Sequence, residues 1–269
     1  MRLSMLSDEI SRDPISAAEL AAEWGLRHFE LRMYYRERAP RGMSDRDMER
    51  LRAAWADFGI DCPSVSPGLF KVRLDDPVIA EHRGDLRERC FDLAEAMGAE
   101  IVVCFPPVMR EGETWWDWPP EVVEDFRETA EMAQARGLRI ALENEPVCYG
   151  GAGQALAKLI EEINHPALGA NWDPGNHTYA TGEDHVDAYE KLRPYHIHTH
   201  VKDYAGKKSR AMPPGEGIVG WQEQLAKMKQ NGYDGLLVLE THFTPKIAGS
   251  RRCVEGMREL LAAIGEEVE

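Results

Sequence analysis

The stretch EVVEDFRETAEMAQARGLRIALE, residues 121–143, contains the alternation that decides the fold. Glu121 to Arg136 has helical periodicity and is followed by Gly137, a residue that readily adopts the left-handed conformation in which helices end. The short apolar run Leu138 to Glu143 comes next and indicates a buried strand. A helix that leads directly into a short apolar strand is the repeating unit of a parallel sheet covered by helices.

The same unit recurs along the whole chain. Further strands are predicted at Arg2 to Leu6, His28 to Arg32, Ile60 to Ser66, Glu100 to Phe105, Leu168 to Asp173, Tyr195 to Lys202 and Gly235 to Glu240. Further helices are predicted at Pro14 to Trp24, Asp45 to Phe58, Arg87 to Met97, Gln222 to Lys229 and Arg252 to Ile264. Eight such pairs of about 30 residues predict an α/β fold, a single (β/α)8 TIM barrel formed by residues 1–269 as one domain. An open doubly wound sheet is disfavoured because SDEISRD, after the first strand, is not a glycine-rich phosphate turn.

Composition narrows the possible partners. The chain has 47 acidic and 32 basic residues, a formal net charge of −15, which disfavours binding to nucleic acid. Its opening turns polar after six residues and no run of 18 apolar residues occurs, so we expect no membrane span and a cytoplasmic protein. The five cysteines are scattered without a C-x-x-C pair, and we expect them to be small core residues in a reducing compartment.

Polar side chains close four consecutive strands. Glu143 ends the fifth predicted strand, Asp173 the sixth, His200 the seventh and Glu240 the eighth. Neighbouring strands are about 4.8 Å apart, so these side chains can converge at the mouth of a barrel. Three carboxylates held together need a cation, and three oxygens with one imidazole suit a single divalent metal ion. We expect Mn²⁺, with Mg²⁺, Co²⁺ or Zn²⁺ as alternatives; for any one of these residues alone, capping of the following helix is an equal possibility.

The segment HIHTHVKD, residues 196–203, places three histidines on one face of a strand by its period of two. Only His200 is expected to reach the mouth, with His198 hydrogen-bonded deeper in the barrel and His196 structural. Lys202 shares their parity and is a candidate to place its charge over a developing oxyanion, the alternative being a solvated lysine.

Seven short motifs resemble, in order, the xylose-isomerase-like barrel superfamily of sugar isomerases and epimerases. They are DEIS, FELR, LENEP, NWDPGNH, HTHVKD, PPGEG and LETH, and they extend over most of the chain. This superfamily also includes endonuclease IV, the tagatose and psicose 3-epimerases, hydroxypyruvate isomerase and inosose dehydratase. The resemblance implies the same four metal ligands, and it implies that His177 contacts substrate, although His177 follows Asp173 by four residues rather than three. The histidine-rich three-metal cluster of endonuclease IV is missing from the sequence, which favours one metal.

The resemblance implies proton transfer next to a carbonyl, with Glu143 and Glu240 as the two bases. The leading hypothesis is a metal-dependent isomerase or epimerase of a small keto sugar, in carbohydrate metabolism. The alternative is a lyase, an inosose or dehydroshikimate-type dehydratase, on the same metal site. A barrel that binds a sugar without turnover is a third possibility.

Further residues are candidates for substrate contact. Glu30, Arg32, His177 and Glu216 are expected to bind hydroxyl groups, each with a salt bridge away from the substrate as the alternative. In TWWDWPP, Trp115, Trp116 and Trp118 could form an apolar wall over the substrate, or else pack on a helix or a subunit interface. A homodimer or homotetramer is therefore possible, and the partner expected in either case is a small sugar.

Overall fold

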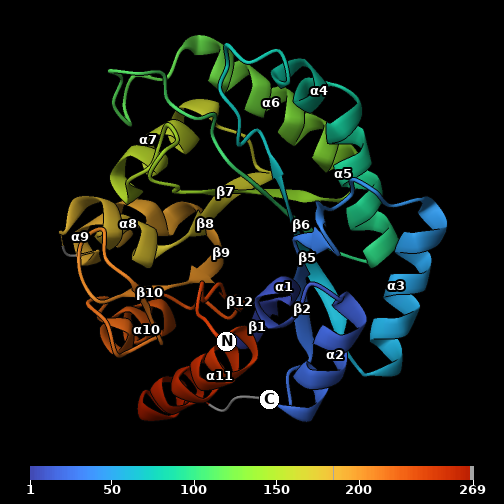
Figure 1. Ribbon diagram of the computed structural model, residues 1–269. Coiled ribbons are helices and arrows are strands. Elements are labelled where there is room, and N and C mark those ends of the chain that lie inside the picture. Colours follow the sequence, from blue (N-terminus) through green and yellow to red (C-terminus); the bar gives the residue numbers. More distant parts are fainter. Residues whose placement is uncertain (184, 267–269) are drawn as a thin grey trace.

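The computed structural model describes residues 1–183 and 185–266, and its centre is a closed barrel of eight parallel strands. These are β1 (Arg2–Leu6), β2 (His28–Leu31), β5 (Asp61–Leu69), β6 (Ile101–Cys104), β7 (Arg139–Glu143), β8 (Leu168–Trp172), β9 (His196–Val201) and β12 (Leu236–Leu239). Neighbours in the barrel are neighbours in this order, and β1 pairs in parallel with both β12 and β2. The predicted single (β/α)8 barrel is confirmed (Figure 1).

The helices surround the barrel as an outer ring, except that the short α1 lies near the centre of the view (Figure 1). They are α1 (Ser7–Ile10), α2 (Pro14–Glu23), α3 (Asp45–Asp57), α4 (Ile79–Arg83), α5 (Asp85–Met97), α6 (Pro120–Ala135), α7 (Gly153–Ile163), α8 (Pro174–Thr181), α9 (Val186–Leu192), α10 (Trp221–Gln230) and α11 (Lys246–Ala263), with a 3₁₀ turn at Arg193–Tyr195. The main error of the predicted boundaries is α11, which begins at Lys246 rather than Arg252. Gly249 does not break this helix; its missing side chain admits the ring of Phe243, whose Cδ1 would lie 2.7 Å from a Cβ at residue 249.

Two short antiparallel hairpins follow strands of the barrel and extend its mouth. β3 (Met33–Tyr34) pairs with β4 (Glu37–Arg38) after β2, and β10 (Asp203–Tyr204) pairs with β11 (Ala211–Met212) after β9. Ser209, between the two strands of the second hairpin, and Ala211 of β11 line a cavity at the mouth.

Large apolar side chains fill the space between the barrel and its helices. Trp55 of α3 is fully buried, lies edge-on to Phe29 of β2 at 5.1 Å between ring centroids, and donates its indole N–H to the carbonyl of Pro14. Burial of a tryptophan of this kind contributes about 3–5 kcal/mol to stability. All five cysteines are free and buried, as predicted. In the described part of the chain, no helix combines the length and apolarity needed to span a membrane.

Candidate metal centre

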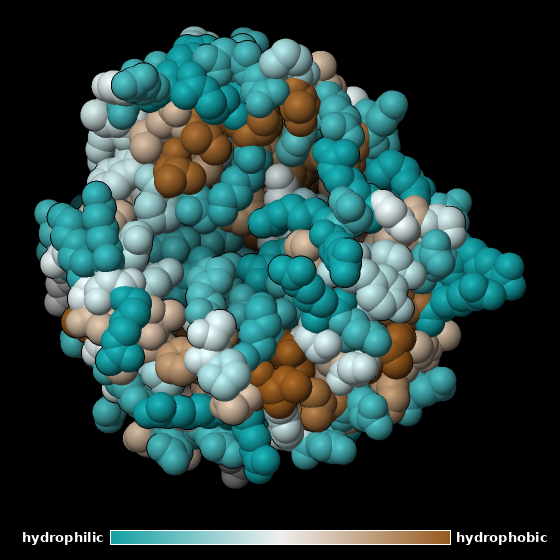
Figure 2. Space-filling view, viewed as in Figure 1, coloured by the Kyte–Doolittle hydropathy of each residue, from teal (hydrophilic) through white to brown (hydrophobic). Residues whose placement is uncertain are grey.

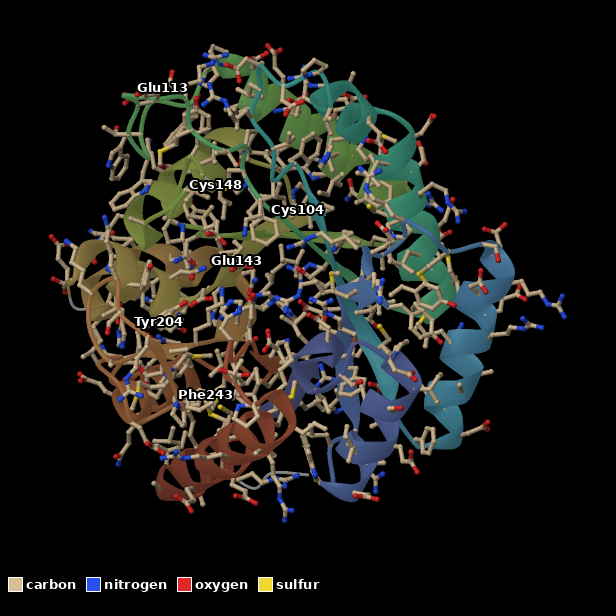
Figure 3. The ribbon with its side chains drawn as sticks, viewed as in Figure 1. Cys104, Glu113, Glu143, Cys148, Tyr204 and Phe243 are labelled. Atoms are coloured by element: carbon tan, nitrogen blue, oxygen red, sulfur yellow. The ribbon has the colours of Figure 1, made fainter. Side chains whose placement is uncertain are left out.

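Four strand ends converge on one point at the mouth of the barrel. Glu143 is the last residue of β7, His200 lies in β9, and Glu240 follows β12 directly. Asp173 follows β8 and caps α8, with its Oδ1 accepting the backbone N–H of Asn176 at 2.8 Å. One ligand atom from each of the four side chains lies within 4.8 Å of the other three. The geometry expected from consecutive parallel strands is therefore present (Figure 3, in which Glu143 is labelled near the centre of the barrel).

The charges in this cluster are strongly coupled. The Lys202 ammonium lies 3.2 Å from Glu143 Oε1, 2.8 Å from Asp173 Oδ2 and 3.0 Å from Glu240 Oε2. Burial alone would raise the pKa of Glu143, but the charges of Lys202 and His200 outweigh it and lower that pKa to about 2. At Asp173 burial prevails over Lys202 and raises the pKa to about 6.

The donor set fits a divalent metal ion. Asp173 Oδ2 and His200 Nδ1 are buried, and neither makes a hydrogen bond within residues 1–183 and 185–266. His200 Nδ1 lies 3.0 Å from Glu143 Oε2 and 3.1 Å from Glu240 Oε2, so this nitrogen faces the carboxylates. Carboxylate oxygens and an imidazole nitrogen are ligands of Mg²⁺, Mn²⁺, Co²⁺ and Zn²⁺. The protein thus has a possible divalent metal site of one imidazole and three carboxylates.

Glu30 supports this cluster from below rather than facing the substrate. It is 0 % exposed; its Oε1 accepts from His200 Nε2 at 2.8 Å, and its Oε2 accepts from His198 Nε2 at 2.7 Å and from Ser64 Oγ at 2.7 Å. These contacts hold the Nδ1 atom of His200 toward the carboxylates, as carboxylates behind metal-bound histidines do. The expected hydroxyl contact of Glu30 is corrected accordingly, whereas the buried, hydrogen-bonded position expected for His198 is confirmed.

A polar cavity of about 690 Å³ lies above the cluster. Among the residues lining it are Arg32, Asn176, Lys202, Tyr204 and Glu240. Arg32 is held in place by Asp8 at 2.8 Å, Glu9 at 2.7 Å and Glu240 at 2.5 Å. Hydrophilic residues surround the central hollow in the space-filling view (Figure 2). Arg32 and Lys202 thus line this cavity, and their contact with a substrate stays a prediction.

Two candidate contacts of the substrate face away from the cavity. His177 is 0 % exposed; its ring lies against Trp172 with 5.9 Å between centroids, and its Nδ1 accepts the N–H of Gly153 at 3.4 Å. Glu216 is exposed and forms an ion pair with Arg252 at 2.5 Å, which is the surface salt bridge considered as its alternative.

The tryptophan wall is also not formed in this structure. Trp115 is half-buried and donates its indole N–H to the carbonyl of Pro146 at 2.9 Å, so it packs behind the loop whose Pro146 lines the cavity. Trp116 is 51 % exposed, and Trp118 donates its indole N–H to Glu162 on α7. The contact of Trp118 with α7 agrees with the packing alternative, and the apolar wall over the substrate stays a prediction.

Sequence reasoning missed several residues that surround the cluster. Asn176 and Asn171 donate to the two oxygens of Glu143 at 2.9 and 3.1 Å. His242 lines the cavity, has a left-handed backbone with φ of 48°, and places its Nε2 3.2 Å from Glu240 Oε1. The motifs NWDPGNH and LETH contain these residues, so the sequence could have pointed to them as neighbours of the predicted ligands. The spacing of the motifs does not show which way each side chain points.

Comparison with known proteins places this architecture in a family. A family model described as xylose isomerase-like TIM barrel matches residues 18–262. The chain belongs to the xylose isomerase-like TIM barrel family. The resemblance of its seven motifs to this family is thereby confirmed.

Proteins with similar sequences include named dehydratases. An uncharacterized protein of Methanocaldococcus jannaschii is 28 % identical over 192 residues, which are 68 % of this chain and 62 % of that protein. A 3-dehydroshikimate dehydratase of Bacillus anthracis is 27 % identical over 130 residues, 42 % of this chain and 46 % of that protein. An inosose dehydratase of Bacillus cereus is 23 % identical over 159 residues, 53 % of this chain and 51 % of that protein. This chain thus matches less than two thirds of the length of these relatives.

Solved structures of the family share the fold over nearly the whole chain. The IolI protein with a bound zinc atom has a TM-score of 0.80 at 15 % identity, covering 98 % of both chains. A xylose isomerase-like protein of Mycobacterium smegmatis in complex with magnesium has a TM-score of 0.77 at 19 % identity, covering 98 % of this chain and 97 % of its own. A D-tagatose 3-epimerase-like protein has a TM-score of 0.77 at 22 % identity and covers 98 % of both chains. Two of these structural neighbours therefore contain a bound metal, and two of the proteins similar in sequence are named dehydratases.

Proposed function

We propose that this chain is a divalent-metal-dependent lyase that removes water from a small polyhydroxylated ketone. One observation carries the proposal: Glu240 lines the cavity and pairs with His242, whereas Glu143, the other carboxylate expected to act as a base, lies beneath and is 1 % exposed. A basic group on one side of the substrate suits elimination better than a two-sided exchange of a proton. The names of the relatives, 3-dehydroshikimate dehydratase and inosose dehydratase, support the same reaction class.

Glu143, Asp173, His200 and Glu240 would hold the metal ion, for which Mn²⁺ is our first choice. When bound, such an ion withdraws electrons from a substrate carbonyl and so makes the neighbouring C–H more acidic. Glu30 keeps the His200 ring turned toward the site through its hydrogen bond to Nε2, and Asn176 and Asn171 fix the carboxylate of Glu143. These contacts hold the donor set in one arrangement before the substrate binds.

His242 is the general base in this proposal. Its imidazole is 48 % exposed, lines the cavity, and is oriented by the carboxylate of Glu240 at 3.2 Å. Its backbone N–H donates to Glu9 Oε2 at 3.1 Å, which helps to hold the left-handed conformation of this residue. His242 takes the proton from the carbon next to the carbonyl, and the Glu240 carboxylate stabilises the imidazolium that forms.

Lys202 completes the elimination as the acid. Its ammonium lines the cavity and is held among the three carboxylates, which raise its pKa well above the ordinary value despite its burial. It therefore enters the reaction protonated. The electron pair of the broken C–H bond forms the carbon–carbon double bond as the C–O bond breaks, and Lys202 donates a proton to the departing hydroxyl, which leaves as water. Afterwards His242 releases its proton to solvent and Lys202 takes one up, so both groups return to their starting state.

Epimerisation or isomerisation of a keto sugar is the second candidate. Oxygen atoms of Glu143 and Glu240 belong to the same cluster of ligand atoms, all within 4.8 Å of one another, which supports transfer of a proton by two carboxylates. In this case the proton returns to the same or the neighbouring carbon and no water is lost.

One experiment separates the two reactions. The Mn²⁺-loaded protein is incubated in D₂O with 3-dehydroshikimate, inosose and a panel of ketoses, and products are followed by ultraviolet absorbance and by nuclear magnetic resonance. The proposal predicts a new conjugated product from a β-hydroxy ketone and loss of turnover in excess chelator. Deuterium in a recovered ketose without a conjugated product would instead support the epimerase, and no change in any compound would contradict both.

Variants test the roles of the residues. H242N and E240Q should each lower the turnover rate by about 10²–10⁴-fold, the usual contribution of a general base, while both proteins stay folded by circular dichroism. E216Q is the matched control, because Glu216 lies on the surface beside Arg252, and it should keep the wild-type rate. An unimpaired H242N would remove the base from the mechanism.

A further inference from the structure

The lining of the cavity above the metal site contains more cationic than anionic side chains, although the whole chain carries a net charge of −15. Three carboxylates line it, from Asp8, Glu145 and Glu240, and each lies in an ion pair with a cation of the same cavity. The lysine and arginine side chains that line it are more numerous: Arg12, Arg32, Arg38, Lys71, Lys202 and Lys246. Buried carboxylates beneath the lining also pair with Arg32, Lys202 and Lys246. Arg12 and Arg38 are therefore the lining cations that have no ion pair within the described ranges 1–183 and 185–266.

Arg38 is a half-buried cation of this lining. Its guanidinium makes no hydrogen bond or ion pair with any residue in the described ranges 1–183 and 185–266, and its Nη1 atom is buried without a partner. The β3–β4 hairpin pairs Arg38 with Met33, and paired residues of an antiparallel hairpin point to the same face. Both side chains line the cavity, so the hairpin directs the guanidinium into it.

Gly68 leaves the room that this guanidinium occupies. A Cβ at residue 68 would lie 2.6 Å from Arg38 Nη1 and 3.1 Å from its Cζ, closer than side-chain carbons approach other atoms. Gly68 also has a φ of +75°, in the left-handed region that favours glycine. Gly68 of β5 and the β3–β4 hairpin together therefore fix the position of the Arg38 side chain.

An arginine without a partner in this position is costly to the folded protein. Burial lowers the pKa of Arg38, and the neighbouring charge of Arg32 lowers it further, against the weaker opposing fields of Glu240, Asp8 and Glu143. A cation whose desolvation is uncompensated destabilises the protein unless a ligand supplies the missing anion. Binding sites often carry such a stability cost.

We propose that Arg38 binds a carboxylate of the substrate, so that the substrates of this site are keto acids rather than neutral ketoses or cyclitols. This inference rests on the proposed function for the carbonyl end of the substrate, which faces the metal site. A guanidinium matches a carboxylate through two parallel hydrogen bonds, and the one positive charge of Arg38 matches the one negative charge of a carboxylate, while Arg12, another cation of the lining, is exposed. Arg38 thereby determines which substrates the metal site receives.

The anion site is tested first without metal, so that its failure can be told apart from failure of the proposed function. In chelator-treated protein, benzoate should raise the thermal midpoint of the wild type and leave that of R38M unchanged. R36M is the matched control, since it removes an exposed arginine from the same hairpin, and it should respond to benzoate as the wild type does. The R38M protein without ligand should unfold at a higher temperature than the wild type, because an uncompensated cation has been removed. A wild-type protein that ignores benzoate, or an R38M protein that still responds, would overturn the proposal.

The Mn²⁺-loaded protein is then titrated calorimetrically with three probes that share a metal-chelating diol. They are 3,4-dihydroxybenzoate, neutral 1,2-dihydroxybenzene and 3,4-dihydroxyphenylphosphonate. The wild type should bind the carboxylate about tenfold or more tightly than the neutral diol, and R38M should lose this preference. Equal binding of the first two probes, or tightest binding of the phosphonate, would overturn the carboxylate assignment. Binding of 3,4-dihydroxybenzoate no tighter than that of benzoate, together with no binding of the neutral diol, would count against the metal site of the proposed function and leave the anion site intact.

Discussion

At the residue scale, burial and partners separate the side chains that form the site from those that only support it. Glu143, Asp173, His200 and Glu240 could be predicted together, because residues at the ends of consecutive parallel strands must lie close to one another. The depth and direction of a side chain could not be predicted in this way. Glu30 shares the barrel interior with His200 but is one layer lower, and His177 turns toward Trp172 because a helix follows Asp173 immediately.

Lys202 provides a test of the charge balance in the cluster. In chelator-treated protein, K202M should be less stable than the wild type by about 3–5 kcal/mol, since it leaves three buried carboxylates without their ammonium. Addition of Mn²⁺ should stabilise K202M more than the wild type, because the ion supplies the missing positive charge. Urea unfolding with and without Mn²⁺ measures both effects, with K191M on the exposed face of α9 as the control. If the two variants have equal stability, Lys202 does not offset the carboxylates.

His82 gives a pH dependence that lies outside the site. Its Nδ1 accepts the backbone N–H of Phe70 at 2.8 Å, and burial lowers its pKa, with Arg41 adding to the effect. The neutral ring is therefore the folded form, and the unfolded chain binds a proton more readily. His82 therefore contributes to the free energy of unfolding above pH 6.5, the ordinary pKa of histidine, and this contribution decreases as the pH falls below 6.5.

The comparison of wild type with H82N isolates this contribution. Asparagine keeps an acceptor for Phe70 but does not titrate. Between pH 7.5 and 5.5 the free energy of unfolding of the wild type should fall by about 1 kcal/mol more than that of H82N. Parallel urea titrations at the two pH values provide the measurement, and identical losses in both proteins would contradict it.

At the element scale, the barrel strands and the helices α2, α3, α5, α6 and α10 could be predicted from period and glycine position to within a few residues, whereas α1, α4, α7, α8 and α9 had no predicted range. The hairpins β3–β4 and β10–β11 could not, because strands of two residues have no periodicity to detect. Their positions depend on contacts between distant residues. Asp203, for example, accepts the backbone N–H groups of Tyr204, Gly215, Gly217 and Val219, and so closes the loop after β9 on itself.

Removal of this carboxylate should open the loop. D203A loses four hydrogen bonds to one buried charge, and hydrogen bonds to charged groups contribute about 1.5–3 kcal/mol each before the loop relaxes. Trypsin should then cleave after Lys207, Lys208 or Arg210 much faster than in the wild type, as identified by mass spectrometry. D57A, at the exposed end of α3, serves as the control. An equally resistant loop in D203A would show that other contacts hold it.

At the scale of the whole molecule, closure of the barrel assembles the site. β1 pairs with both β2 and β12, so Asp8 and Glu9, which follow the first strand, meet Arg32 after the second and Glu240 after the last. The eightfold repeat predicted this closure, but the identity of the substrate depends on which cations remain unpaired in the cavity, and only the three-dimensional structure reveals that. Family membership agrees with the architecture. The proposed reaction depends on a metal ion held by one group of four side chains.

Anomalous X-ray diffraction from crystals grown with Mn²⁺, recorded at the manganese absorption edge, tests that claim most directly. The account predicts one strong peak bounded by Glu143, Asp173, His200 and Glu240. The distances from the peak to these donors should be close to 2.0–2.3 Å, roughly those of other divalent ions bound by oxygen and nitrogen. A peak at another place, or no peak among these four side chains, would contradict it.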